Sequence, residues 1–104
     1  MSIENEYKDL AVRADSATKY HSSIPIMMGK LPVQEIVKLG AGVLPSLFND
    51  LTNKKFGIGW RMAAIRAILE NNGLPPVEIP DELRGRVVEM VRIHVEYGHD
   101  HGYI

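Results

Sequence analysis

The chain has 104 residues, 45% hydrophobic and 24% charged, a composition typical of one small globular domain rather than a disordered chain. Its 12 basic and 13 acidic side chains leave a formal net charge of −1, so no overall field favours a nucleic-acid binder or an acidic DNA mimic. Because the chain has no cysteine, disulfide bonds, thiolate metal sites and a cysteine nucleophile are excluded.

The sequence also bears on where the protein works. No stretch approaches the roughly 18 consecutive apolar residues of a membrane-spanning helix. The N-terminal segment MSIENEYKDL is polar and acidic, the reverse of a secretory signal. Absence of cysteine fits a reducing compartment. We therefore expect a cytoplasmic protein that has no membrane partner.

The first half of the chain predicts helices with recognisable ends. Residues 3–20 place apolar side chains at helical spacing, and Ser2 is suited to cap them. A short apolar segment precedes Gly29. A second helix follows over residues 33–39, where Pro32 fits the start and Gly40 the end.

The segment 43–71 predicts a helical hairpin. In its first helix Leu44, Leu47, Phe48 and Leu51 have the i, i+3, i+4, i+7 spacing of a core-facing stripe. A glycine-containing turn leads into a second helix over about residues 59–71. That helix is apolar on more than one side, so we expect it to be central. Its expected solvent-facing side chains are Arg61, Arg66 and Glu70.

The last third of the chain predicts a connector, one helix and a tail. Three prolines make residues 74–80 an extended connector. Asp81 is placed to cap a terminal helix over residues 82–97, which Gly98 would end, leaving residues 98–104 as a tail. No segment alternates like a strand. We predict an all-α fold of four to five helices, a single small HEAT-like domain over residues 1–104.

Several turn and core motifs resemble those of a group of small bacterial all-helical proteins with a HEAT-repeat-like hairpin. The resemblance covers most of residues 7–104 and is carried by Ser22-Ser23, Ile36–Gly40, Val43–Leu47, Leu51, Trp60, Ala64–Ile68, Tyr97-Gly98 and Gly102-Tyr103. The chain departs from the group at His94 and Tyr97, where a second tryptophan is usual, and in a longer KKFGIG turn. The resemblance implies a bacterial or phage accessory protein with a HEAT-like fold, and it brings no catalytic residue.

The C-terminal histidines are the densest set of potential metal ligands. Imidazoles at His94, His99 and His101, with carboxylates nearby, suit zinc, nickel or copper. However, His94 and Glu96 lie about 200° apart around a helix, and the other histidines lie beyond Gly98. A core position for His94 and a tail without a metal are favoured, and we expect neither a metal nor a cofactor.

A basic segment provides the main candidate binding residues. No acidic residue occurs between Thr52 and Leu69, a region that contains Lys54, Lys55, Phe56, Arg61 and Arg66. Basic side chains beside an aromatic ring can bind phosphate or an acidic protein surface. An ordinary solvated face explains the same residues, and the sequence favours that explanation.

These observations lead to three functional hypotheses. The first is a non-catalytic protein–protein interaction module, for instance an antitoxin-, immunity- or phage-inhibitor-type accessory protein, because no active site is recognisable. The second is nucleic-acid or nucleotide binding through the basic segment. The third and weakest is a metal-dependent enzyme that uses the histidine tail.

Overall fold

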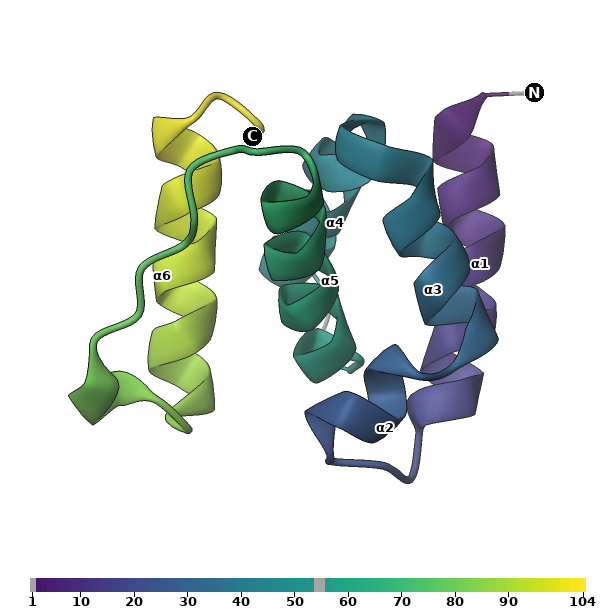
Figure 1. The fold of residues 1–104 in the computed structure, drawn as a ribbon, viewed down its shortest axis with the longest axis horizontal. Coiled ribbons are helices and arrows are strands. Elements are labelled where there is room, and N and C mark those ends of the chain that lie inside the picture. Colours follow the sequence, from purple (N-terminus) through teal and green to yellow (C-terminus); the bar gives the residue numbers. More distant parts are fainter. Residues whose placement is uncertain (1, 54–55) are drawn as a thin grey trace.

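The computed structural model describes residues 2–53 and 56–104, and it begins with a long N-terminal helix. Helix α1 spans Ile3–Thr18, and the Ser2 hydroxyl accepts a hydrogen bond from the Asn5 N–H at 3.3 Å, which confirms the predicted cap. Its buried side chains include Tyr7, Ala11 and Ala14. The two alanines allow a close approach, and α1 packs against α3 (Figure 1).

Proline and glycine determine where the next helices begin and end. Helices α2 (Ile24–Met28) and α3 (Leu31–Leu39) each have a proline in the first turn, where the missing N–H costs no hydrogen bond. Gly40 has a φ of 81° and stops α3, as predicted. A 3₁₀ turn, η1 (Gly40–Val43), then redirects the chain.

Helices α4 and α5 form the centre of the core. Helix α4 spans Leu44–Asn53 and buries the four residues of the predicted apolar stripe. Helix α5 spans Ile58–Asn71 and packs against α2, α3, α4 and α6, so it is buried on most sides. Trp60 is fully buried, which confirms the prediction of a central helix. The solvent-facing position expected for Arg61 is wrong, because its side chain is 0% exposed.

The C-terminal helix differs from the predicted range 82–97. Asp81–Leu83 forms only a 3₁₀ turn, η2, and α6 spans Val87–Asp100. Gly85 has a φ of 85°, which breaks the helix between them. Gly98 continues the helix because it is packed on Phe48: a Cβ at Gly98 would lie 2.9 Å from the Phe48 ring.

The sequence predicts a tail over residues 98–104, but α6 continues to Asp100. The residues after α6 fold back on the domain. After α6, the N–H groups of Tyr103 and Ile104 donate to the Gly98 carbonyl oxygen at 2.8 and 3.3 Å. The Tyr103 ring stacks with Phe48 at a centroid distance of 5.3 Å. Residues 101–104 therefore close the end of α6 against α4.

These elements confirm the all-α fold class. The described residues contain five helices of nine or more residues, the short α2, two 3₁₀ turns and no strand. In Figure 1 the α4–α5 pair lies between α1 and α3 on one side and α6 on the other, and residues 72–86 run from the end of α5 to the start of α6. No helix in residues 2–53 or 56–104 has the length and apolar character needed to cross a bilayer.

Candidate functional site

The fold places the described residues of the predicted basic segment in different environments. Lys54 and Lys55 lie outside the described residues. Phe56 is 83% exposed, Arg66 is half-buried, and Arg61 points into the interior. Arg61 therefore cannot act as a surface contact for phosphate, and it does not share an exposed basic face with Arg66.

Arg61 is the centre of a buried polar network that joins three helices. Its Nη1 and Nη2 donate to both carboxylate oxygens of Asp15 on α1 at 2.8 and 3.1 Å, and its Nε donates to Asp50 on α4 at 3.3 Å. Two backbone carbonyl oxygens, of Phe56 and Gly57, accept from Nη1 at 3.1 and 3.2 Å. Every nitrogen of the guanidinium thus donates to an acceptor inside the protein, so Arg61 has a structural position.

Two aromatic side chains complete this network. The Tyr7 hydroxyl donates to Asp50 at 2.7 Å, and the Trp60 Nε1 donates to Asp15 at 2.9 Å. Burial, followed by the hydrogen bond to Asp50, raises the pKa of Tyr7 above its usual value, so the phenol stays protonated. Burial alone would lower the pKa of Arg61, but the hydrogen bond to Asp15 and the interactions with Tyr7 raise it. The Tyr7, Asp15, Asp50, Trp60 and Arg61 side chains of this network are thus bound to one another inside the protein.

A second polar contact joins α5 to α6. The Nδ1 of His94 lies 2.7 Å from the carbonyl oxygen of Met90, and its Nε2 lies 3.1 Å from the Nη1 of Arg66. A carbonyl can only accept, so Nδ1 carries the proton and Nε2 accepts from Arg66. Burial, with a smaller contribution from the Arg66 charge, lowers the pKa of His94 to about 4. His94 is thus a neutral core histidine, as predicted.

The predicted metal ligands do not come together. His94 is buried against Met90 and Arg66, whereas the His101 ring stacks on Tyr97 with a centroid distance of 3.8 Å. His99 is exposed on the last turn of α6. In residues 2–53 and 56–104, no group of three or more His, Asp or Glu side chains is arranged to hold a metal ion. The absence of bound metal stays a prediction for analysis of the purified protein.

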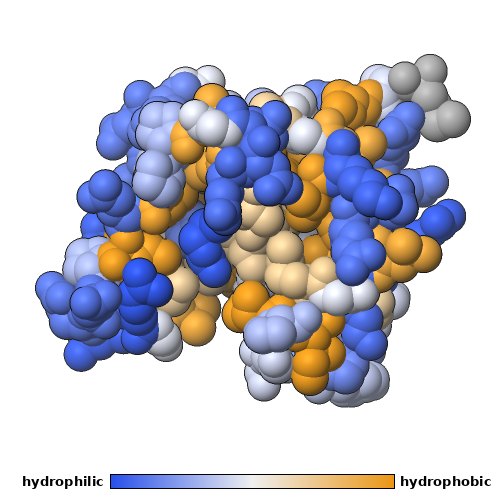
Figure 2. Space-filling model, viewed as in Figure 1, coloured by the Kyte–Doolittle hydropathy of each residue, from blue (hydrophilic) through white to orange (hydrophobic). Residues whose placement is uncertain are grey.

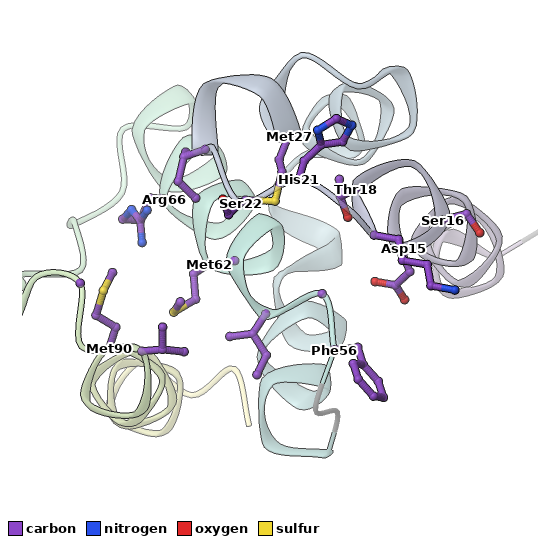
Figure 3. A pocket seen from close by; sticks show the side chains of 17 residues that line it. Asp15, Ser16, Thr18, His21, Ser22, Met27, Phe56, Met62, Arg66 and Met90 are labelled. Atoms are coloured by element: carbon purple, nitrogen blue, oxygen red, sulfur yellow. The ribbon is translucent and has the colours of Figure 1, made fainter.

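A feature not predicted from the sequence is an apolar groove of about 940 Å³. Helix α5 forms its floor, the end of α1 with α2 forms one wall, and the start of α6 forms the other. Figure 3 shows methionines from α2, α5 and α6 around it. Its lining comprises Asp15, Ser16, Thr18, Lys19, His21, Ser22, Ile24, Met27, Phe56, Gly57, Ile58, Gly59, Met62, Arg66, Gly85, Val87 and Met90.

We call this hollow the methionine groove. Its rim carries exposed apolar side chains. Ile24, Phe56 and Val87 are 38%, 83% and 54% exposed and come from three separate elements. In the space-filling view of Figure 2 the surface is hollowed at its lower edge, between α2 and the start of α6. Apolar side chains that converge from separate elements on one hollow are typical of an interaction site.

No local signal in the sequence identifies the methionine groove. Met27, Met62 and Met90 lie on three helices that are distant in sequence, and each methionine by itself fits an ordinary core position. The nearest sequence signal is the prediction that Phe56 belongs to a binding surface.

Comparison with protein-family models, with curated proteins and with solved structures gives no match.

Proposed function

We propose that this protein is a non-catalytic protein–protein interaction module and that the methionine groove is its docking site. The observation that carries the proposal is the convergence of Met27, Met62 and Met90 under a rim of exposed apolar residues. Met27 and Met62 are 6% and 4% exposed and lie at the bottom of the groove, so its accessible apolar surface comes from the half-buried Met90 and the rim. An antitoxin, an immunity protein and a phage inhibitor are examples of proteins that act by such binding alone.

The rim favours a protein partner over a small molecule. A small ligand could fill the floor of a groove of this volume. It would still leave Phe56 and Val87 facing water, because these side chains lie at the edge. A partner protein covers floor and rim together and removes more apolar surface from water.

Two further proposals accompany this function. The α4–α5 pair, with its apolar stripe and central second helix, supports a HEAT-like hairpin whose second helix forms the floor of the groove. We also propose that the protein acts in the cytoplasm, which its cysteine-free composition fits, and that it is a bacterial or phage accessory protein, as its motif resemblance implies.

Nucleic-acid binding remains the alternative hypothesis, and the burial of Arg61 weakens it. Phe56 and Arg66 line the apolar methionine groove, which is a poor match for a phosphate backbone, and Lys54 and Lys55 lie outside the described residues. We expect no gel shift of duplex DNA or RNA at micromolar protein and physiological salt. A shift that is lost in the double variant Lys54→Glu/Lys55→Glu would reverse the ranking.

The docking site can be tested with two neighbouring valines. Val87 lines the methionine groove, whereas Val88 is 81% exposed and does not. Both lie in the first turn of α6, where a glutamate is tolerated and even favourable for the helix. Val87→Glu and Val88→Glu therefore form a matched pair that differs in the position of one charge.

Affinity capture from lysates of the cells that make the protein would compare this pair with the wild type. We expect one stoichiometric partner on the wild type and on Val88→Glu, and its loss on Val87→Glu. Equal recovery on all three proteins would place the docking site elsewhere. Equal melting temperatures of the two variants would exclude unfolding as the cause of any loss.

A further inference from the structure

The methionine groove contains one arginine without a carboxylate partner. Arg66 on α5 is half-buried, and its Nη1 donates to the Nε2 of the neutral His94 ring at 3.1 Å. Among residues 2–53 and 56–104 it forms no ion pair, although Glu70 lies one turn further along the helix. The remaining N–H groups of its guanidinium are available to an incoming acceptor.

The surroundings make this arginine attract an anion. Burial, and then repulsion from Arg84, lowers the pKa of Arg66, which shows that its charge is poorly compensated. Asp15 also lines the groove, but Arg61 and Trp60 already engage both of its oxygens. Figure 3 shows Asp15 and Arg66 on opposite sides of the groove. Lys19 adds a second positive charge to the lining.

The secondary structure around the groove indicates which secondary structure a bound segment would have. The walls and floor are helices and turns, and the described residues contain no strand whose edge could pair with an extended peptide. A segment that enters an apolar groove must therefore satisfy its own backbone N–H and C=O groups, which a helix does.

We propose that the partner presents an amphipathic helix whose apolar face fills the methionine groove and whose Asp or Glu side chain forms an ion pair with Arg66. This inference rests on the proposed function of the groove. A carboxylate accepts two parallel N–H groups from a guanidinium, so the pair would fix the register of the helix as well as contribute affinity. Apolar contacts with the exposed rim side chains Ile24, Phe56 and Val87 would supply the rest of the binding.

The proposal is tested with a displayed library of helical peptides. The library holds apolar residues at i, i+3, i+4 and i+7 and randomises the flanking positions between Glu, Gln, Lys and Ser. It is selected on the wild-type protein, and binders that compete with one another are kept. We expect enrichment of Glu at one fixed position beside the apolar stripe.

A double-mutant cycle then assigns the charge to Arg66. Arg66→Gln keeps an N–H donor for His94 and removes the positive charge, and Arg66→Lys keeps the charge. Replacing the selected Glu of the peptide by Gln should weaken binding to the wild type about tenfold and leave binding to Arg66→Gln nearly unchanged. Arg66→Lys should restore part of the difference, and added salt should reduce it.

The outcomes separate the two levels of the proposal. If the Glu-to-Gln change weakens binding equally on the wild type and on Arg66→Gln, the ion pair is wrong. Continued loss of binding in Val87→Glu, but not in Val88→Glu, would then still support the groove. If no peptide is enriched, or if Val87→Glu binds the selected peptides as the wild type does, the docking function of the groove is itself wrong.

Discussion

The guanidinium of Arg61 binds both carboxylate oxygens of Asp15, at 2.8 and 3.1 Å, and so joins α5 to α1 inside the protein. Gly57, the residue before α5, has a φ of 68°, and a Cβ there would clash with both of these side chains. The backbone of this turn thus approaches the ion pair as closely as only glycine permits. The same turn carries Phe56 to the rim of the methionine groove.

Loss of Arg61 should destabilise the fold strongly. Arg61→Met keeps the length of the side chain but leaves Asp15 and Asp50 without their cation. We expect the free energy of unfolding in urea to fall by about 3–5 kcal/mol. Arg92→Met is the matched control, because Arg92 forms its ion pairs with the exposed Glu89 and Glu96, and we expect a loss of at most about 1 kcal/mol. Similar small losses in both variants would show that the network contributes little.

Trp60 should be essential for stability because it is fully buried and its indole Nε1 donates to Asp15. Trp60→Ala is expected to lose about 3–5 kcal/mol, enough to leave the protein unfolded or barely folded at 37 °C. Trp60→Phe keeps most of the apolar contact and loses the hydrogen bond, so its melting temperature should lie between those of the wild type and Trp60→Ala. A melting temperature of Trp60→Ala within a few degrees of wild type would contradict this.

Acid should destabilise the protein through His94. Its pKa is about 4 in the folded protein and near 6.5 in the unfolded chain, so between these values the unfolded state binds a proton that the folded state does not. The free energy of unfolding should therefore fall as the pH decreases from 6.5 to 4, by about 3 kcal/mol from this group. His94→Gln removes the titration and should flatten this part of the stability curve. Equal slopes in both proteins would mean that another group is responsible.

The purified, untagged protein is expected to carry no stoichiometric zinc, nickel or copper. The three candidate histidines are separated by the packing of His94 inside the domain and of His101 on Tyr97. Bringing them together around one ion would require breaking both contacts. Elemental analysis is the measurement. One metal ion per chain, lost in the double variant His99→Ala/His101→Ala, would restore the metal-dependent hypothesis.

The sequence predicts the features of this fold that depend on local chemistry. The Ser2 cap, the end of α3 at Gly40 and the burial of Trp60 follow from capping, backbone freedom and apolar spacing, and the structure confirms them. Gly98 shows the limit of such rules. It resembles a helix stop, yet the distant Phe48 packs on it and makes the absence of a side chain a requirement inside the helix.

The candidate site depends on contacts that are distant in sequence. From the sequence, Arg61 resembles a solvent-facing residue. Its neighbours in the sequence do not indicate that it forms an ion pair with Asp15 on α1. The methionine groove is assembled from α2, α5 and α6, and its residues acquire a shared role only when the helices pack. Sequence periodicity identifies helices, but it does not indicate which of their apolar residues remain uncovered at the surface.

Whether the methionine groove receives a segment of another protein is tested most directly by site-specific photo-crosslinking in the cells that make the protein. A benzophenone amino acid would replace Val87 at the rim in one protein and the exposed Val12 of α1, which does not line the groove, in another. We predict one defined protein adduct from position 87 and none from position 12. No adduct from position 87, or the same adduct from both positions, would contradict a docking role for the groove.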